Sequence, residues 1–311
     1  MAPQGALILD LKQLDYYVRV AELGSFTKAA ALLSVAQSAL SHQVRQLEIE
    51  FRQPLLHRNG RGVTPTDAGN RLLAHARGIL TQVDRARDEL ADQRGAPVGH
   101  LVIGLPATIA RLLTVPVFKS FQAAFPKATF GMVEGLSAAI VDWVATGRAD
   151  VGLIFDPIPS PSLDLIPLHQ QEMFLISAKE DKPRPGGRAV RMQDLPRYPL
   201  IVPSRLNANR RRIESQFADL GLRATVAHEI DGIASILDLV HEGYGHAILP
   251  LSSLRGHSLA AELDIRPIVN PKLTIQLAFV VSSQRPTTPL TREAVGLIHS
   301  IALGLLTAKP A

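Results

Sequence analysis

The chain has 311 residues, of which 46% are hydrophobic and 20% are charged, and its formal net charge is +5. This size and composition fit a folded protein of two or three domains and exclude a wholly disordered chain. It contains no cysteine, which excludes disulfides, thiol catalysis and cysteine-ligated zinc. We expect a cytoplasmic protein with no secretory signal and no membrane span, and its basic character permits nucleic acid as a partner.

The first part of the chain, to about residue 94, is helical in pattern. An apolar stripe marks a first helix, and Ser25 is the expected cap of a short second helix over residues 26–33. A tight turn at Ser34 and Val35 separates this helix from the next one. A short helix, a tight turn and a helix with one polar face form a helix-turn-helix, in which the second helix enters the major groove of DNA.

The helix that would enter the major groove is predicted over AQSALSHQVRQLE, residues 36–48. Leu40, Val44 and Leu47 recur at the spacing of a buried helical stripe. The opposite face carries hydrogen-bonding side chains that suit base edges and phosphates, namely Gln37, Ser38, Ser41, His42 and Arg45. Every amphipathic helix has a polar face, so a merely solvated face is the alternative interpretation. The carboxylates come only at Glu48 and Glu50, away from the leading end of the helix, and this favours DNA binding.

A hairpin is predicted next, because NGRG is a turn signal between two short extended pieces of LLHRNGRGVTPTDAG. The hairpin would form a wing, with Arg58 and Arg61 placed against phosphates or in the adjacent minor groove.

A long helix capped by Thr66 and Asp67 follows the hairpin. Its apolar residues recur at heptad spacing, as Leu72, Ala76, Ile79, Val83, Ala86 and Leu90. No partner for this stripe is obvious within so small a domain, so we expect the helix to pair with a second copy of the chain. Such a dimer presents two recognition helices to a two-fold operator.

The segment GAPVG, residues 95–99, is a linker that marks a change of fold class. After it, short β-branched runs alternate with helical runs in two sets, which predicts parallel sheets covered by helices and a cleft between two halves. Dinucleotide, P-loop, zinc-protease and serine-hydrolase motifs are missing from the sequence, so we expect no cofactor, no metal and no catalytic residue.

The sequences LDYYVRVAELGSFTKAAALLSVAQSALSHQVRQLE and LLHRNGRGVTPTDAG resemble the LysR-type transcriptional regulators, and the likeness covers the whole chain. RGVTPTDAG and GYGHAILP are most similar to the nitrogen assimilation control subgroup. The chain departs from the family at Ser38, often Pro, at Leu56, usually Phe, and at His246, where the family places an apolar residue.

The resemblance implies an N-terminal all-α winged helix-turn-helix with a long linker helix, followed by a C-terminal α/β effector domain of two lobes, like the periplasmic binding proteins. The implied divisions are residues 1–65 for DNA binding, 66–94 for dimerisation and 97–311 for the effector. Residues 97–170 and 268–311 would form lobe I, and residues 171–267 would form lobe II.

The resemblance also implies roles for single residues. Gln37, Ser41 and His42 match positions that contact DNA, with Arg45 nearer the phosphates and Arg61 in the wing.

Effector binding is implied at Thr108, Ser137 and Ser204, each of which is expected to begin a helix, where the dipole favours an anion. A plain helix cap is an equal alternative for each of them. Arg205 is a further candidate, for binding a carboxylate, whereas the run at residues 210–212 fits a solvated face better.

The expected partners are therefore a double-stranded DNA operator, a small-molecule effector and further copies of the chain, as a dimer or tetramer. The resemblance also admits RNA polymerase as a partner. The competing hypothesis is a small-molecule-binding or enzymatic α/β protein whose N-terminal helices only dimerise.

Overall fold

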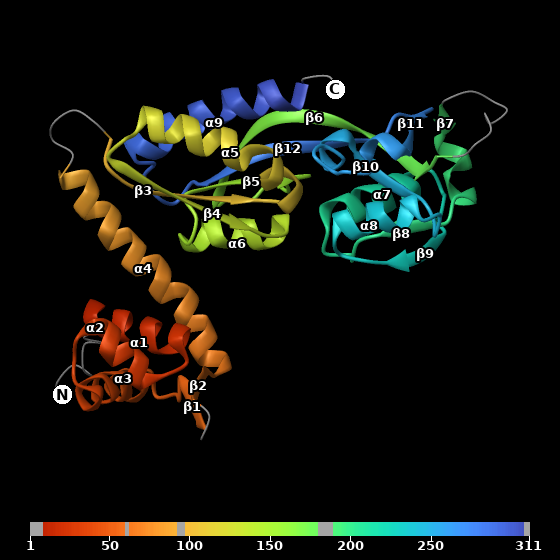
Figure 1. Cartoon of the computed structure of the whole chain (residues 1–311). Helices are drawn as coiled ribbons and strands as arrows, with labels where there is room; N and C mark the ends of the chain where they lie inside the picture. The colour runs from red at the N-terminus through yellow and green to blue at the C-terminus, as the bar shows by residue number, and fades with distance from the viewer. Residues whose placement is uncertain (1–8, 60–61, 92–96, 180–188, 308–311) are drawn as a thin grey trace. The chain divides into compact units, whose positions relative to one another are not determined.

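The computed structural model describes residues 9–59, 62–91, 97–179 and 189–307 (Figure 1). The chain forms two compact units, of which the first contains residues 1–93 and the second contains nearly all of residues 94–311. Arg61, predicted in the wing, lies outside the described residues.

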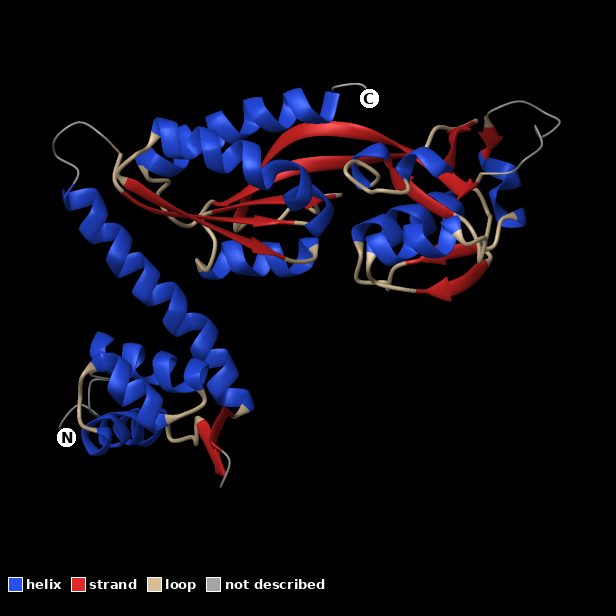
Figure 2. Ribbon diagram, viewed as in Figure 1, coloured by secondary structure: helices blue, strands red, loops and turns tan. Residues whose placement is uncertain are grey.

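The first unit contains helices and one β-hairpin in its described residues (Figure 2). They are α1 (Leu11–Leu23), α2 (Phe26–Leu33), α3 (Gln37–Phe51), β1 (Leu56–Asn59), β2 (Gly62–Pro65) and α4 (Asp67–Ala91). Ser25 caps α2 as predicted, since its Oγ accepts a hydrogen bond from the backbone N–H of Lys28 at 3.3 Å. Ser34 ends that helix in the left-handed conformation, with φ of 54°. The predicted helix-turn-helix and wing are both confirmed.

The apolar stripe of α3 forms part of the core of this unit. Leu40, Val44 and Leu47 are each 0% exposed, as the helical spacing predicts. Truncating one such leucine to alanine costs about 2 to 5 kcal/mol of stability. Because this apolar face of α3 is buried in the core, the opposite, polar face points to solvent.

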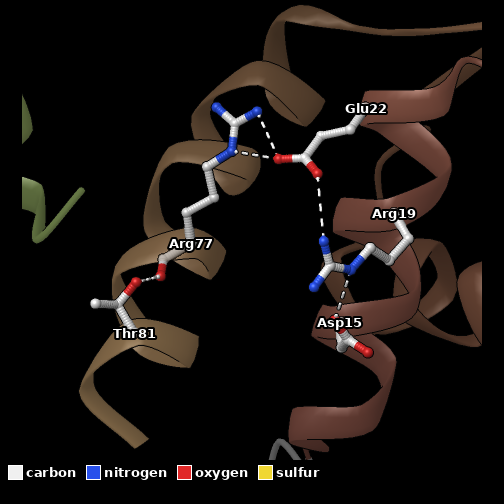
Figure 3. A network of polar contacts seen from close by, with 5 residues as sticks. All are labelled: Asp15, Arg19, Glu22, Arg77 and Thr81. Carbon is white, nitrogen blue, oxygen red and sulfur yellow. Dashed lines mark hydrogen bonds and ion pairs between the residues drawn. The ribbon is translucent and has the colours of Figure 1, made fainter. Parts of the chain in front are cut away.

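A polar network joins α4 to α1 (Figure 3). The Nη2 of Arg77 lies 2.9 Å from the Oε1 of Glu22, which also accepts a hydrogen bond from Nε at the same distance. The other Glu22 oxygen lies 3.8 Å from Arg19, and Arg19 pairs in turn with Asp15 at 3.3 Å. Because two donors of one guanidinium meet the same carboxylate oxygen, the network holds α4 against α1.

The prediction that the stripe of α4 has no partner within its own domain is wrong for the first part of the helix. Ala76 is 0% exposed and Leu72 is partly buried, and both pack against the core of the first unit. Further along α4, Ile79 is 38% exposed and Ala86 is exposed. The side chain of Leu90 lies outside the described residues. Only the later part of the stripe remains available to a second chain.

The second unit has two lobes that share long strands (Figure 1). Its helices and main strands are β3 (Gly99–Leu105), α5 (Ala107–Ala124), β4 (Ala128–Glu134), α6 (Ser137–Thr146), β5 (Val151–Phe155), β6 (Leu163–Ala178), β8 (Leu200–Val202), α7 (Ala208–Asp219), β9 (Val226–Glu229), α8 (Ile233–His241), β10 (Ala247–Pro250), β11 (Leu263–Val269), β12 (Thr274–Ser282) and α9 (Pro289–Thr307). A two-residue strand, β7 (Val190–Arg191), pairs with β11.

The prediction of a parallel sheet is only partly correct, because the main sheet is mixed. Strand β3 runs parallel to β4 and β5, whereas β12 runs antiparallel to both β5 and β6. The first part of β6 pairs with β12, and its last part pairs with β10 and β11. One continuous strand of 16 residues thus passes from one lobe to the other.

Helices cover both faces of the sheet in lobe I, as predicted. Helices α5 and α9 contact each other and share the largest core cluster, while α6 packs on the opposite face through Ile140 and Val144 (Figure 1). In lobe II, Leu200 and Val202 of β8 belong to the cluster that contains α7, and Ile201 belongs to that of α8. This alternation follows from the two-residue period of a strand.

Among the described residues, α9 alone is long and apolar enough to cross a membrane by length and composition. Leu290, Ala294, Ile298 and Ala302 of this helix are buried in the core cluster that also contains α5. A helix that covers a protein core passes the same test, and its packing explains its composition.

Candidate DNA-binding surface and effector cavity

The polar face of α3 lies on the surface of the first unit. Gln37, Ser38, His42 and Arg45 are exposed, and Ser41 is half-buried. The helix begins without a side-chain cap and without an acidic residue in its first turn. Its first N–H groups and the positive end of its dipole are therefore available to an anion such as a phosphate.

Two contacts connect this face with neighbouring elements. The Oγ1 of Thr27 donates a hydrogen bond to the Oε1 of Gln37 at 3.4 Å. In the wing, Arg58 is exposed, and its Nη1 donates to the Oγ of Ser41 at 3.3 Å. The same guanidinium lies over the ring of Phe26, 4.7 Å from its centroid. The structure thus brings Ser41 and Arg58 together, and it adds Thr27 and Phe26, which the sequence analysis had not selected.

His42 lies beside another side chain of its own helix. Its Nε2 is 3.5 Å from the Nε2 of Gln46, one turn further along α3. Gln46 is exposed and extends the polar face beyond the predicted set. Its i, i+4 spacing from His42 was a signal in the sequence that could have identified it.

The first carboxylate of α3 has a structural role. The Oε1 of Glu48 accepts hydrogen bonds from the backbone N–H groups of Leu55 at 2.9 Å and Leu56 at 3.2 Å, where the wing begins. Burial and, to a smaller extent, the charge of Glu48 together raise the pKa of Tyr17 to about 12, against the opposing effect of Arg77. Glu48 therefore fixes the start of the wing to the later part of the recognition helix.

The second unit contains a cavity of about 450 Å³. The N-terminal turns of α5, α6, α7 and α8 all contribute to its lining. The polar lining residues are Thr108, Arg111, Glu134, Ser137, Asn207, Asn209, Asp231 and Ser253. Its size is that of a small-molecule site, and several helix N-termini around one cavity favour a ligand with a negatively charged group.

The predicted effector residues divide into two pairs. Thr108, in the first turn of α5, and Ser137, the first residue of α6, both line the cavity. Ser204 and Arg205 are not among its lining residues. The expectation that Ser204 begins a helix is wrong, because α7 begins only at Ala208.

Ser204 nevertheless affects the cavity through Asp231, which lines it. Its backbone N–H donates to the Oδ1 of Asp231 at 2.9 Å. Hydrogen bonds from the side chain and the backbone of Ser204 lower the pKa of Asp231. Asp231 therefore presents a charged carboxylate to the cavity at neutral pH.

The basic run at residues 210–212 is used within the protein. Arg210 is 5% exposed and pairs with Glu214, and its Nη1 donates to the carbonyl of Pro203 at 3.3 Å. The Nε of Arg212 donates to the carbonyl of Thr274 at 2.7 Å. These arginines stabilise the second unit and are neither a solvated face nor part of the cavity lining.

A winged helix-turn-helix with an outward polar face, joined to a two-lobed unit with a ligand-sized cavity, defines a DNA-binding regulator of the ligand-responsive class. Residues 11–70 match the bacterial regulatory helix-turn-helix protein, lysR family, and residues 94–301 match the LysR substrate binding domain. The chain belongs to the LysR family of bacterial transcriptional regulators.

Individual relatives agree with this assignment. The nitrogen assimilation regulatory protein nac of Escherichia coli (strain K12) is 31% identical over 294 residues, which cover 94% of this chain and 95% of that protein. This similarity supports the subgroup that the sequence indicated. Full-length OxyR from Pseudomonas aeruginosa has a similar fold, with a TM-score of 0.72 at 22% identity over 94% of both chains. CbnR complexed with its target DNA has a TM-score of 0.54 at 22% identity, over 94% of this chain and 100% of that chain.

Proposed function

We propose that two copies of this chain bind an inverted-repeat operator, with one α3 in each half-site, and that a small molecule with an anionic group binds in the cavity and controls this activity. The observation that carries the proposal is the surface of α3, which presents Gln37, Ser38, His42 and Arg45 to solvent beside an uncapped helix N-terminus. The structure of CbnR with its target DNA supports the same mode of binding.

Each part of the chain has a proposed task. Residues 1–65 bind DNA, residues 66–94 dimerise through the exposed part of α4, and residues 97–311 bind the effector. A ligand changes the regulator only if it binds one arrangement of the subunits better than the other. We place this activity in the cytoplasm, where bacterial DNA is located, and we infer that the chain acts without catalysing a reaction.

A mobility-shift experiment with DNA from beside the gene of this protein tests the proposal. The full chain should form a specific complex that weakens as the salt concentration rises. Gln37→Ala should reduce discrimination between the operator and a mutated operator by about 1 to 3 kcal/mol, because a bidentate base contact is lost. Gln122 of α5 is exposed in the second unit, so Gln122→Ala is the matched control and should leave discrimination unchanged.

Two results would contradict the proposal. One is the absence of any specific, salt-sensitive complex. The other is a biochemical activity that survives deletion of residues 1–65, since this would favour a small-molecule-binding protein or an enzyme instead.

A further inference from the structure

The cavity lining contains two carboxylates and one guanidinium, so its net charge is negative. Glu134 ends β4 in lobe I, and Asp231 lies directly before the N-cap of α8 in lobe II. In the part of the chain that the structure describes, no ion pair joins either of them to a basic side chain. Arg111, the basic residue of the lining, donates to the carbonyl of Gly256. A ligand that covers these carboxylates without a compensating charge incurs a large desolvation cost.

Positive helix ends lie next to these carboxylates in the sequence and line the same cavity. The N-cap residues of α5 and α8 are Pro106 and Gly232, and neither helix has a side-chain cap. Asp231 directly precedes the N-cap of α8, and Glu134 precedes the first residue of α6 by three positions. The lining of the cavity therefore offers both donors for an anion and acceptors for a cation.

Two buried polar atoms at the cavity still lack partners. Asn209 and Ser253 line it and are only 5% and 6% exposed, and neither the Oδ1 of Asn209 nor the Oγ of Ser253 has a hydrogen-bond partner. An amide oxygen can only accept a hydrogen bond, so Asn209 requires a donor. A ligand with N–H groups supplies one.

We propose that the effector is a zwitterion of the α-amino acid type, whose carboxylate binds the N-terminal turns of α5 and α8 and whose ammonium group binds Glu134 and Asp231. The two charges of an α-amino acid are attached to one carbon, which suits a single cavity lined by both helix ends and carboxylates. This inference rests on the proposed effector function of the cavity, and it adds a positive group to the anionic group proposed there.

Calorimetric titration of the full chain with each of the twenty standard amino acids tests the proposal. At least one should bind, and its matched deamino acid and its matched decarboxylated amine should each bind roughly 10- to 100-fold more weakly, because each lacks one charge-assisted interaction. Glu134→Gln should weaken binding of the amino acid while leaving the affinity for its deamino acid unchanged or higher. Glu293 is exposed on α9, so Glu293→Gln is the matched control and should change neither affinity.

Binding of none of the twenty amino acids would overturn the proposal, and so would equal affinity for an amino acid and its deamino analogue. A mobility shift on the same preparation separates the two levels of inference. If specific DNA binding persists and responds to a plain carboxylic acid, the proposed regulatory function stands and the zwitterion is wrong. If no specific DNA binding occurs, the regulatory function fails whatever the cavity binds.

Discussion

The contacts of Arg58 lead to a quantitative prediction about DNA binding. This side chain is held between Phe26 and Ser41, yet it remains exposed, so its other N–H groups are available to a phosphate. Arg58→Ala should therefore weaken binding to operator and non-operator DNA by similar factors. Arg58→Lys retains the charge but loses the planar group that stacks on the ring, so its effect should be smaller.

The magnitude follows from counterion release. Each lost phosphate contact changes the slope of log affinity against log salt by about 0.9, so two copies in a dimer change it by about 1.8. Between 50 and 200 mM salt, a change of that size means that the variant loses about tenfold less affinity than the unaltered protein. Fluorescence anisotropy of labelled operator over this range of salt gives both slopes.

The control is Arg292→Ala on α9. Arg292 is exposed and belongs to the second unit, outside the residues proposed to bind DNA or to dimerise. This variant should leave the slope unchanged. A normal slope for Arg58→Ala, together with a loss of discrimination between operators, would refute the reasoning and assign Arg58 to base recognition.

Two further predictions concern the stability of the first unit. Tyr17 stays protonated up to about pH 12 in the folded protein and to about pH 10 when unfolded, so its contribution to stability is present below pH 10 and is lost as the pH rises. Denaturant titration followed by circular dichroism should show about 1.4 kcal/mol less stabilisation from this group at pH 11 than at pH 8, and Tyr17→Phe should abolish that difference. A pH dependence identical in both proteins would contradict this. A Cβ on Gly69 would lie 2.1 Å from the carbonyl oxygen of Leu55, whereas one on Gly296 of α9 meets nothing within 4 Å. Gly69→Ala should therefore cost about 1 to 3 kcal/mol or more, and Gly296→Ala should stabilise by up to about 1 kcal/mol; equal effects would show that the close approach at Gly69 is relieved.

The first unit could be predicted closely because its signals are local. The stripe of Leu40, Val44 and Leu47, the cap at Ser25 and the NGRG turn each operate within a few residues. The wrong interpretation of α4 had a different origin. Heptad spacing shows that a stripe is apolar, but it does not show whether the stripe packs on another chain or, as at Ala76, on its own.

The sheet of the second unit could be predicted only in part, because its pairing is not local. The sequence indicated the buried end of β6 at FLIS, but the strand begins at Leu163. The missed portion contains Pro167, which argues against a strand, yet it lies opposite Ala278 beside an irregularity in the register with β12. The partner strand begins at Thr274, about a hundred residues later, so no short window of sequence reveals the pairing.

The cavity illustrates the same limit. Thr108 and Ser137 were implied by the resemblance to the family, and each was also expected to begin a helix after a strand. Glu134 and Asp231 could not be selected from the sequence, because a carboxylate before a helix is common. Their relevance to ligand binding follows only from the fold, which brings both of them to one cavity. Ser204 contributes through its bonds to Asp231, which sequence position alone does not reveal.

His246, which replaces the apolar residue usual in the family, is explained by partners that are distant in sequence. Its Nδ1 lies 2.8 Å from the Oγ of Ser177. The centroids of its ring and of the Tyr198 ring are 5.1 Å apart, in a T-shaped arrangement. Ser177 also accepts a hydrogen bond from the buried guanidinium of Arg266, whose Nη2 lies 3.3 Å away. His246 therefore belongs to a polar cluster with Ser177, Tyr198 and Arg266, in which Ser177 contacts both the imidazole and the buried guanidinium. An apolar residue at this position could not bond to the hydroxyl of Ser177.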